Sequence, residues 1–473
     1  MILSSIILLN IHTSYLNKII IKSIPKINII CNLKKTNYNN DVMFMKEKLT
    51  KSFIIDLSHK KKEPEWMLDF RLKSFECFEK LENPSFGPEL NFSFDDILYY
   101  KKDDDLKDDW KDVKKTTYNT FCKLGVVDAE KKYLDGVSNQ LESEVVYHKN
   151  NTNKDIIFMS TDEALQRYPD LFKKYFNTLV KYNENKYTAL NGACWSGGSF
   201  IYIPPNTKLD RPLQSYFRID TESLGQFERT LIIVDKGAEL SYIEGCTARS
   251  YAKSSLHAGV VEIFVLEGAK CRYSTIQNWS NDVYNLVTKR AITKENATME
   301  WVDGNVGSGV TMKYPSIILE GDNSFGNCIS IAYAKKGQQL DAGAKMIHLG
   351  KNTRSNIVNK SIAEGGGVSN FRGTTKITEE ATNSIATIKC DTILLDDISK
   401  SDTYPKNIVL NNSSTLEHEA TVSKVNVEKL FYLESRGLSE DRAKELYILG
   451  FVEDFKKELP MEYAVELNRL INE

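Results

Sequence analysis

Two cysteines of this chain stand at spacings that could place other reactive side chains beside them. The first, Cys246, is 28 residues after Arg218 and 31 residues before Gln277, and Trp279 follows two residues later. If the chain folds back on itself with a period of this size, a cation, a thiol and an amide would lie in one file. Nearby cations lower the pKa of a thiol and make its thiolate available as a nucleophile. The alternative interpretation is a buried and inert structural cysteine.

Cys390 is the second candidate, because a polar triplet follows it at a similar spacing. The triplet is Glu417, His418 and Glu419, and His418 is 28 residues after Cys390. A thiolate, an imidazole and carboxylates on adjacent turns of a repeating fold would suit a soft or borderline metal ion. The alternative is an exposed strand that carries a histidine between glutamates by chance. Five other cysteines have no such neighbours and are interpreted as structural: Cys31, Cys77, Cys122, Cys194 and Cys328.

The period itself is visible in the middle of the chain. The turn residues Gly237, Gly268 and Asn296 occur in similar segments and are 31 and 28 residues apart. A fixed period of this length, built from short strands, favours a stacked β-solenoid such as a β-helix over an antiparallel sandwich. Short β-rich runs predict strands over residues 199–203, 229–234, 260–266, 316–319, 329–333, 345–349, 385–388 and 407–410.

Composition divides the chain into regions that must hold these residues in place. The β-rich core is flanked by charged, helical stretches, in which helices are predicted over 64–81 and 160–182. The four predicted regions are an N-terminal extension (1–50), an N-terminal helical region (51–190), the solenoid core (191–425) and a C-terminal helical region (426–473).

The C-terminal region reads as a small helical unit. Gly437 predicts the end of one helix, and Ser439 predicts the start of a second that ends before Gly450. Pro460 precedes a third predicted helix. Such a unit docks either on a partner or on its own domain, and the pattern does not separate the two.

The first 40 residues contain no Asp or Glu. The opening run 1–17 holds seven polar residues, which makes it a poor membrane span, and no basic residue precedes it as a secretory signal requires. The segment is interpreted either as a loosely ordered extension or as an organelle-targeting segment. No later run reaches the roughly 18 apolar residues of a membrane helix.

Several classes of function are excluded by composition and motifs. The chain of 473 residues has 62 Lys and Arg against 64 Asp and Glu, a balance that argues against a general nucleic-acid binder. It has no C-x-x-C pair, which excludes zinc ribbons and ferredoxin-type cluster motifs. P-loop, Rossmann and H-E-x-x-H motifs are absent. The glycine run 365–367 is interpreted as a β-turn and the acidic run 101–110 as a solvated loop.

Long segments make the chain similar to a known family. They include 63–73 (EPEWMLDFRLK), 225–246 (GQFERTLIIVDKGAELSYIEGC), 345–355 (KMIHLGKNTRS), 417–424 (EHEATVSK) and 458–466 (ELPMEYAVE). With shorter matches they extend over nearly everything from about residue 60 onward. They resemble the SufB/SufD family of the SUF iron–sulfur cluster assembly system, and within it the SufB members. Residues 1–50 match nothing in that family.

The resemblance implies a mainly β fold, with a right-handed parallel β-helix core and α-helical regions at both ends. It implies a scaffold rather than an enzyme, which accepts persulfide sulfur and iron, builds a nascent Fe–S cluster and passes it to apoproteins. The implied partners are a SufC ATPase docked on 426–473, SufD or a second SufB, the sulfur donor SufS with SufE, and acceptors such as SufA. The cluster would be of the 4Fe–4S type, and the complex would bind reduced flavin (FADH2).

The same resemblance assigns roles to individual residues. Cys246 matches the sulfur acceptor, and the matching sulfur path comprises Arg218, Gln277, Trp279 and Lys289. The nascent-cluster end matches Cys390, Glu417, His418 and Glu419, of which Cys390, His418 and Glu419 would hold iron. Asp220 departs from the family, where Asn is usual, and an acid there would raise the pKa of a neighbouring thiol.

Two other functions and two compartments stay open. A SufD-like partner would dock the ATPase without holding a cluster. A β-helical enzyme acting on polysaccharide would need clustered acids on an exposed face, and no such file is evident in the sequence. The Lys, Asn and Ile bias and the lack of a clean transit peptide favour the stroma of a plastid (an apicoplast), with bacterial cytoplasm as the alternative.

Overall fold

The computed structural model describes residues 43–44, 48–150, 155–251 and 253–458. All of them belong to one compact unit, Asp41–Glu473. Residues 1–42 of the predicted extension and the helix predicted after Pro460 lie outside the described residues. No helix in the described part of the chain is both long and apolar enough to cross a membrane.

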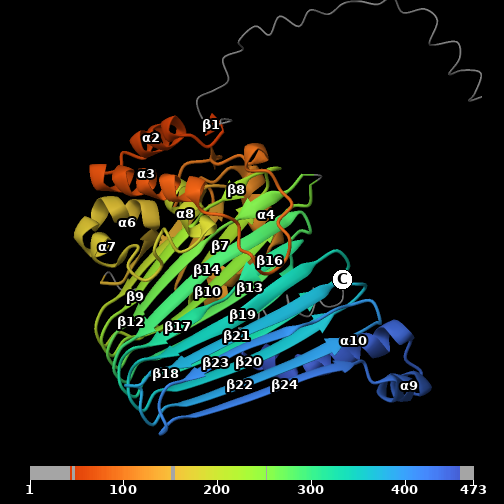
Figure 1. The fold of residues 1–473 in the computed structure, drawn as a ribbon. Helices are drawn as coiled ribbons and strands as arrows, with labels where there is room; N and C mark the ends of the chain where they lie inside the picture. Colours follow the sequence, from red (N-terminus) through yellow and green to blue (C-terminus); the bar gives the residue numbers. More distant parts are fainter. Residues whose placement is uncertain (1–42, 45–47, 151–154, 252, 459–473) are drawn as a thin grey trace, which may run out of the picture. The chain divides into compact units, whose positions relative to one another are not determined.

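Two facing sheets of mostly parallel strands form a β-solenoid of about 8 turns, which confirms the predicted mainly β fold (Figure 1). The 10-stranded sheet contains β3 (Gly136–Leu141), β4 (Glu144–Asn150), β7 (Leu213–Ile219), β10 (Glu239–Ala248), β13 (Lys270–Trp279), β15 (Thr298–Gly307), β18 (Phe325–Ala334), β20 (Arg354–Ala363), β22 (Ile385–Leu394) and β24 (Thr415–Lys424).

The 12-stranded sheet lies opposite and includes several short strands. It contains β5 (Ile157–Ser160), β6 (Ser199–Ile203), β8 (Gly225–Gln226), β9 (Arg229–Val234), β11 (Ser255–His257), β12 (Val260–Val265), β14 (Val283–Thr293), β16 (Val310–Lys313), β17 (Ser316–Leu319), β19 (Gln339–His348), β21 (Val368–Ile377) and β23 (Thr403–Val409). Of these, β6, β9 and β17 have the bounds that the β-rich runs predict.

The turns between the sheets explain the repeat seen in the sequence. Gly237 and Gly268 have φ of 66° and Asn296 has φ of 57°. Glycine and asparagine adopt this left-handed conformation at the lowest cost. The Gly237 N–H donates to the Glu267 carbonyl, one turn further along the solenoid. The repeated turn residues therefore lie one above the other.

The interior between the sheets is filled by inward-facing residues of both. Successive residues of a strand point to opposite faces, so Leu240 and Tyr242 face inward, against residues of the other sheet such as Val261. Ile243, which follows Tyr242, points to the outer face and belongs to the same buried cluster as Phe455. Tyr242, Tyr273 and Trp301 stand on three consecutive turns, with ring centroids 4.9 and 5.0 Å apart. This aromatic file fills the centre of the solenoid.

The N-terminal region carries most of the helices, together with strands that the sequence does not signal. Strand β3 pairs in parallel with β7, so residues predicted as helical begin the 10-stranded sheet. Its residues Ser138, Asn139 and Gln140 are buried although they are polar, which hides the strand pattern. The helices are α2 (Lys51–Lys60), α3 (Glu65–Lys80), η2 (Phe94–Asp96), α4 (Lys115–Lys123), α5 (Val126–Tyr133), α6 (Thr161–Arg167), α7 (Pro169–Tyr175) and α8 (Lys186–Cys194), with a small sheet of β1 (Met43–Phe44) and β2 (Lys101–Lys102).

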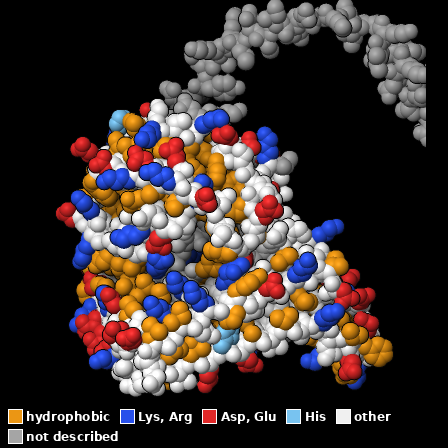
Figure 2. Space-filling model, viewed as in Figure 1, with side chains coloured by type: hydrophobic (Ala, Val, Ile, Leu, Met, Phe, Trp, Pro, Cys, Tyr) orange, Lys and Arg blue, Asp and Glu red, His pale blue; other side chains and the backbone are white. Residues whose placement is uncertain are grey.

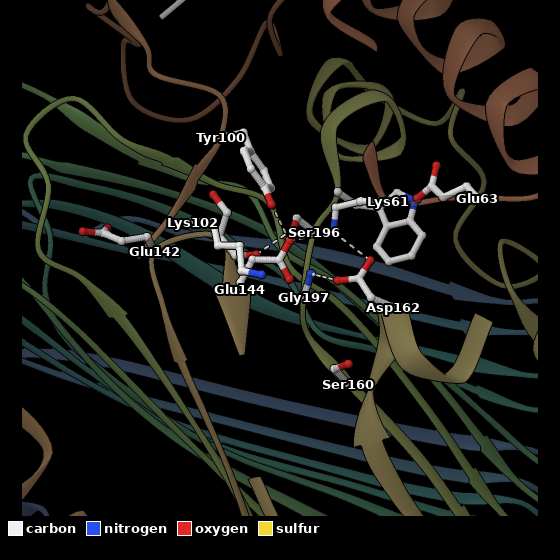
Figure 3. Close-up of polar contacts among 12 residues, drawn as sticks. Lys61, Glu63, Tyr100, Lys102, Glu142, Glu144, Ser160, Asp162, Ser196 and Gly197 are labelled. Atoms are coloured by element: carbon white, nitrogen blue, oxygen red, sulfur yellow. Dashed lines mark hydrogen bonds and ion pairs between the residues drawn. The ribbon is translucent and has the colours of Figure 1, made fainter. Parts of the chain in front are cut away.

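A polar cluster joins these helices to the first turn of the solenoid (Figure 3). Lys61, just after α2, lies 3.1 Å from Glu144 of β4 and 2.8 Å from Asp162 of α6. The Gly197 N–H donates to the other oxygen of Asp162 at 2.8 Å, and the Tyr100 hydroxyl donates to Glu144 at 2.7 Å. Because each partner comes from a different segment, the cluster connects the N-terminal helices to the first strands of the solenoid.

The C-terminal helices are α9 (Val427–Ser435), α10 (Glu440–Phe451) and α11 (Glu453–Glu458). Helix α10 and helix α11 pack on the outer face of the 10-stranded sheet. Ser439 caps α10 as predicted, and Gly437 has φ of 93° between the two helices, but α10 continues through Gly450 instead of ending before it. Lys360 of β20 donates to the Phe451 carbonyl at 2.9 Å. The unit therefore docks, at least in part, on its own domain.

Candidate functional site

Cys246 lies near the end of β10, on the inner face of the solenoid, with a side chain only 1% exposed. It is level with Phe217 on one side and with Gln277 on the other. It packs against Phe217, Trp279 and Val283. The predicted alignment of the thiol with the amide of Gln277 is therefore confirmed.

The predicted alignment with Arg218 is wrong by one residue. Arg218 is level with Thr247, because the offset between β7 and β10 is 29 residues rather than 28. A shift of one residue moves a side chain to the opposite face of the sheet. Arg218 accordingly donates to Thr247 at 2.9 Å and to Asp220 at 2.7 Å, away from the thiol.

Asp220, the residue that departs from the family, is held by two arginines. Besides Arg218, it lies 3.3 Å from Nε of Arg249, and the Tyr251 hydroxyl donates to its carbonyl. These contacts fasten the segment after β10 to the segment after β7. The charges with the largest effect on the pKa of Cys246 are those of Glu244, Glu228, Lys289 and Lys313, and Asp220 is not one of them.

A carboxylate inside the solenoid is the nearest charged neighbour of the thiol. Glu244 precedes Cys246 by two residues and shares its inward face, and its Oε1 lies 3.8 Å from Sγ. The Lys289 Nζ, from β14 in the opposite sheet, lies 3.1 Å from the same oxygen, and the Tyr273 hydroxyl donates to Oε2. Glu244 and Lys289 are both 1% exposed. The thiol thus faces a buried ion pair that spans the interior.

The electrostatics around Cys246 differ from the prediction of a lowered thiol pKa. Burial raises the pKa of Cys246 well above its usual value, and the charges of Glu244 and Glu228 raise it further. The cations Lys289 and Lys313 act in the opposite direction but do not outweigh these effects. At neutral pH the resting form is therefore the thiol, and sulfur chemistry at Cys246 requires a group that takes its proton.

A second buried pair links the thiol's surroundings to the predicted path residues. His257 Nε2 lies 2.9 Å from Glu228, and its Nδ1 is 2.8 Å from the Asn285 side chain, which donates to Gln277 at 2.6 Å. The His257 ring lies 4.7 Å from that of Trp279. Gly259 is required here, because a Cβ at that position would lie 1.9 Å from a Glu228 oxygen.

Three of the predicted path residues thus converge inside the solenoid. Gln277, Trp279 and Lys289, with Glu244, form the buried group of side chains around Cys246, here named the chamber. Arg218 does not belong to it. The Gln277 Nε2 and the Trp279 Nε1 are buried and have no hydrogen-bond partner among the described residues. Such donors are available to a polar guest, because an unsatisfied buried donor is costly when the site stays empty.

A polar file runs from this chamber along the inner face of the 10-stranded sheet. Each residue is level with the next on the neighbouring strand, and Ser330 is hydrogen-bonded to Asn359 at 2.7 Å. Asp303 in the file is paired with Lys313 at 2.8 Å. The file consists of Glu244, Thr275, Asp303, Ser330, Asn359 and Cys390.

The predicted metal-binding set around Cys390 is only partly brought together. Cys390 is level with Ala420, and His418 is level with Ile388, so thiol and imidazole share the inner face two residues apart. Glu417 and Glu419 point to the outer face, where Glu419 lies 3.7 Å from Lys389. In the described ranges no group of three or more His, Cys, Asp and Glu side chains could hold a metal ion.

The two inward donors at this end fit a metal ion in part. The His418 Nε2 has no partner in the described part of the chain, although its Nδ1 lies 3.1 Å from Asn407. Burial raises the pKa of Cys390 to about 12, so metal binding would have to displace its proton. Strands β24 and β23 end their sheets. Further ligands would therefore have to come from a molecule docked on this edge.

Sequence reasoning missed the buried charges. Glu244, Glu228, His257, Asp303 and Lys313 are each at most 2% exposed, inside the solenoid. One signal was available for Glu244: it stands two residues before Cys246 in a strand, and alternation places both on one face.

Comparison with known proteins agrees with this architecture. Residues 217–451 match the family model described as "SUF system FeS cluster assembly, SufBD core domain", and residues 55–215 match "SufBD protein N-terminal region". An iron–sulfur cluster assembly SufBD family protein of Staphylococcus aureus is 56% identical over 441 residues, covering 92% of this chain and 95% of the relative. One of Staphylococcus saprophyticus is 55% identical over 428 residues, covering 89% and 92%.

Proposed function

The chain belongs to the SufBD family of iron–sulfur cluster assembly proteins, and on that premise we propose that it is the SufB-type scaffold. It takes up persulfide sulfur at Cys246, builds a nascent cluster with Cys390 and passes it to apoproteins. It is an assembly component rather than an enzyme, and ATP hydrolysis belongs to a SufC partner. The relatives' names do not separate SufB from SufD, so this assignment depends on the site.

One observation carries the proposal: a thiol enclosed by charged pairs lies on the same inner face as a second buried thiol. Cys246 has Glu244 and Lys289 beside it, and the file that begins at Glu244 reaches Cys390. A SufD-like partner that holds no cluster has no need for either thiol. The second candidate function, a polysaccharide-acting β-helix, is favoured by no observation.

Uptake of sulfur by Cys246 is a thiol–persulfide exchange. The sulfur of Cys246 attacks the outer sulfur of the donor persulfide, the donor S–S bond breaks, and the donor leaves as a thiolate. Burial of Cys246 inside the solenoid keeps water and oxidants from the new persulfide, and the unpaired donors of Gln277 and Trp279 support its binding. We expect SufS with SufE as the donor system.

Cluster building needs a second molecule at the open end of the solenoid. Iron enters as a substrate, and Cys390 and His418 supply two ligands on the inner face. Glu417 and Glu419 lie on the outer face, so in this chain alone they do not complete the set. We propose that SufD or a second copy of the chain docks on β23 and β24 and supplies the rest. A 4Fe–4S product, reduced flavin as reductant, and SufA as acceptor are parts of the same proposal.

The exposed apolar residues of helix α9 support our proposal that the ATPase docks there. Its residues Val427, Phe431 and Tyr432 are 72%, 69% and 56% exposed. Figure 2 shows hydrophobic side chains among charged ones over this part of the molecule. Since α10 and α11 already pack on the chain's own sheet, α9 remains as the apolar surface for SufC.

The compartment remains a prediction, because the named relatives are bacterial. From the Lys, Asn and Ile bias of the sequence, we propose that the protein works in the plastid stroma. Bacterial cytoplasm is the alternative. Mapping the coding gene to a plastid genome would support the first. A nuclear gene with cleavage near residue 40 would contradict a plastid-encoded origin.

Anaerobic reconstitution tests the scaffold role. The chain and a SufC–SufD complex are incubated with iron and sulfide, and visible absorption and Mössbauer spectra are recorded. We expect a cluster spectrum that Cys390→Ala abolishes. Cys328→Ala is the matched control, because Cys328 is also a buried thiol of the solenoid but lies outside the polar file. An unchanged spectrum in Cys390→Ala would place the cluster elsewhere.

A further inference from the structure

Glu244 has the position of a base for the buried thiol. Its Oε1 lies 3.8 Å from Sγ of Cys246, within the range of an S–H···O hydrogen bond, and the two residues share one face of one strand. Both are 1% exposed, so water does not compete for the proton. We propose that Glu244 is the group that accepts the Cys246 proton during sulfur uptake, with Lys289 and Tyr273 as positioning residues. This inference rests on the proposed function of Cys246.

The proton and electron balance of the step is simple. The S–H bond of Cys246 breaks and its proton passes to Oε1 of Glu244, while the sulfur forms a bond to the outer sulfur of the donor persulfide. The donor S–S bond breaks and its electron pair leaves with the donor thiolate. That thiolate then takes the proton from Glu244, which restores the carboxylate. Cys246 ends as a persulfide, the donor as a thiol, and no external oxidant or reductant is consumed.

The neighbours of Glu244 suit this role. The Lys289 ammonium, 3.1 Å from Oε1, and the Tyr273 hydroxyl, which donates to Oε2, hold the Glu244 side chain in place beside the thiol. Lys289 is not the base: burial by itself lowers its pKa, but the charges of Glu244 and Asp303 outweigh burial, so its pKa is raised and it stays protonated. Glu228 is already paired with His257, whose Nε2 lies 2.9 Å from its Oε2. The other titratable groups that face the chamber are Tyr242, Asp303 and Lys313.

The sign of one substitution separates a base from a mere neighbouring charge. Loss of the negative charge in Glu244→Gln lowers the pKa of Cys246, so a purely electrostatic role predicts faster sulfur uptake. Loss of a general base instead slows the step by about 100-fold near neutral pH. The loss should shrink at alkaline pH, where the thiolate forms without a base.

The experiment uses the full chain and glutathione persulfide as the sulfur source. The rate at which Cys246 gains one sulfur atom is measured by peptide mass spectrometry across the pH range. Asp341→Asn is the matched control, since Asp341 is a buried carboxylate that accepts from Tyr314 at 2.7 Å and from Arg372 at 2.7 Å, with no thiol beside it. We expect its uptake rate to equal that of the wild type, and Glu244→Asp to recover part of the lost rate.

The outcomes are separable. Wild-type Cys246 that gains no sulfur would refute the proposed function itself. A wild type that gains sulfur, with Glu244→Gln as fast or faster, would overturn only the role of Glu244. If Glu244→Gln does not fold, Tyr273→Phe replaces it, because it removes only the hydroxyl that aims the carboxylate. A loss of about tenfold is then expected, the size of one hydrogen bond to a charged group, and an unchanged rate contradicts the inference.

Discussion

Glu244 and Cys390 lie on one file of level residues along the inner face of the 10-stranded sheet, with four strands between them. At about 4.8 Å per strand, five steps separate the two positions by roughly 24 Å. Sulfur accepted at Cys246 is therefore far from the predicted cluster end. We propose that sulfur passes between them through the solenoid interior, which the polar side chains of the file face.

Trp301→Ala tests whether the aromatic file supports the fold. Trp301 is fully buried beside Tyr273, with ring centroids 5.0 Å apart. Removing a buried aromatic side chain costs about 3–5 kcal/mol of unfolding free energy. Denaturant unfolding of the variant should show a loss of this size. Phe431→Ala, at a residue 69% exposed, is the control with an expected change near zero.

His348→Gln tests a pH dependence with a definite sign. His348 is buried between Thr353 and Ser355, each 2.8 Å from one ring nitrogen, and burial lowers its pKa to about 4. Because the unfolded chain binds a proton near pH 6.5 and the folded chain does not, stability falls as pH drops from about 6.5 to about 4. The loss is about 3 kcal/mol for this group.

The measurement is the free energy of unfolding as a function of pH for both proteins. The variant is less stable at neutral pH, since it loses the imidazole contacts. Its stability should nevertheless decline less steeply on acidification. Parallel curves for wild type and variant would show that His348 does not titrate in this way.

Asp220→Asn tests the residue that departs from the family. The carboxylate lies 2.7 Å from Arg218 and 3.3 Å from Arg249, and it is not among the largest charge effects on the pKa of Cys246. We expect sulfur uptake at Cys246 to be unchanged, because Arg218, which binds Asp220, points to the opposite face of the sheet from the thiol. Amide hydrogen exchange at Arg249 and Tyr251 should become faster. A large change in uptake would instead mean that Asp220 belongs to the sulfur chemistry.

Phe431→Ala tests the docking surface on α9. A large exposed aromatic side chain at the centre of an interface contributes at least about 1–2 kcal/mol, which is roughly tenfold or more in affinity. Titration calorimetry with the SufC ATPase should show that loss. Glu434→Gln, an exposed residue of the same helix, should bind as the wild type does. Equal affinities for all three proteins would move the interface away from α9.

The repeat could be predicted from the sequence, but its register could not. The turn residues Gly237 and Gly268 mark the coils because a left-handed backbone position favours glycine. The offset between level residues nevertheless varies, from 26 between Tyr284 and Val310 to 32 between Phe371 and Thr403. An average period is therefore insufficient, since an error of one residue reverses the face of a side chain.

The buried ion pairs depend on how the two sheets face each other. Glu244 and Lys289 are 45 residues apart, and their contact crosses the interior. Charged residues in strands are ordinarily expected outside, because burying a charge is costly unless it is paired. No local pattern announces the partner. The family resemblance assigned a role to Lys289 from the sequence. The contact of Lys289 with Glu244, in contrast, follows only from the structure.

We propose that sulfur enters at Cys246 and reaches Cys390. The most direct test of this transfer is an isotope-labelled sulfur pulse from a persulfide donor, followed by an unlabelled chase and peptide mass spectrometry of each cysteine. We expect label first on Cys246 and then on Cys390, no label on Cys390 in Cys246→Ser, and label retained on Cys246 in Cys390→Ala. Label that reaches Cys390 in Cys246→Ser as fast as in the wild type would contradict it.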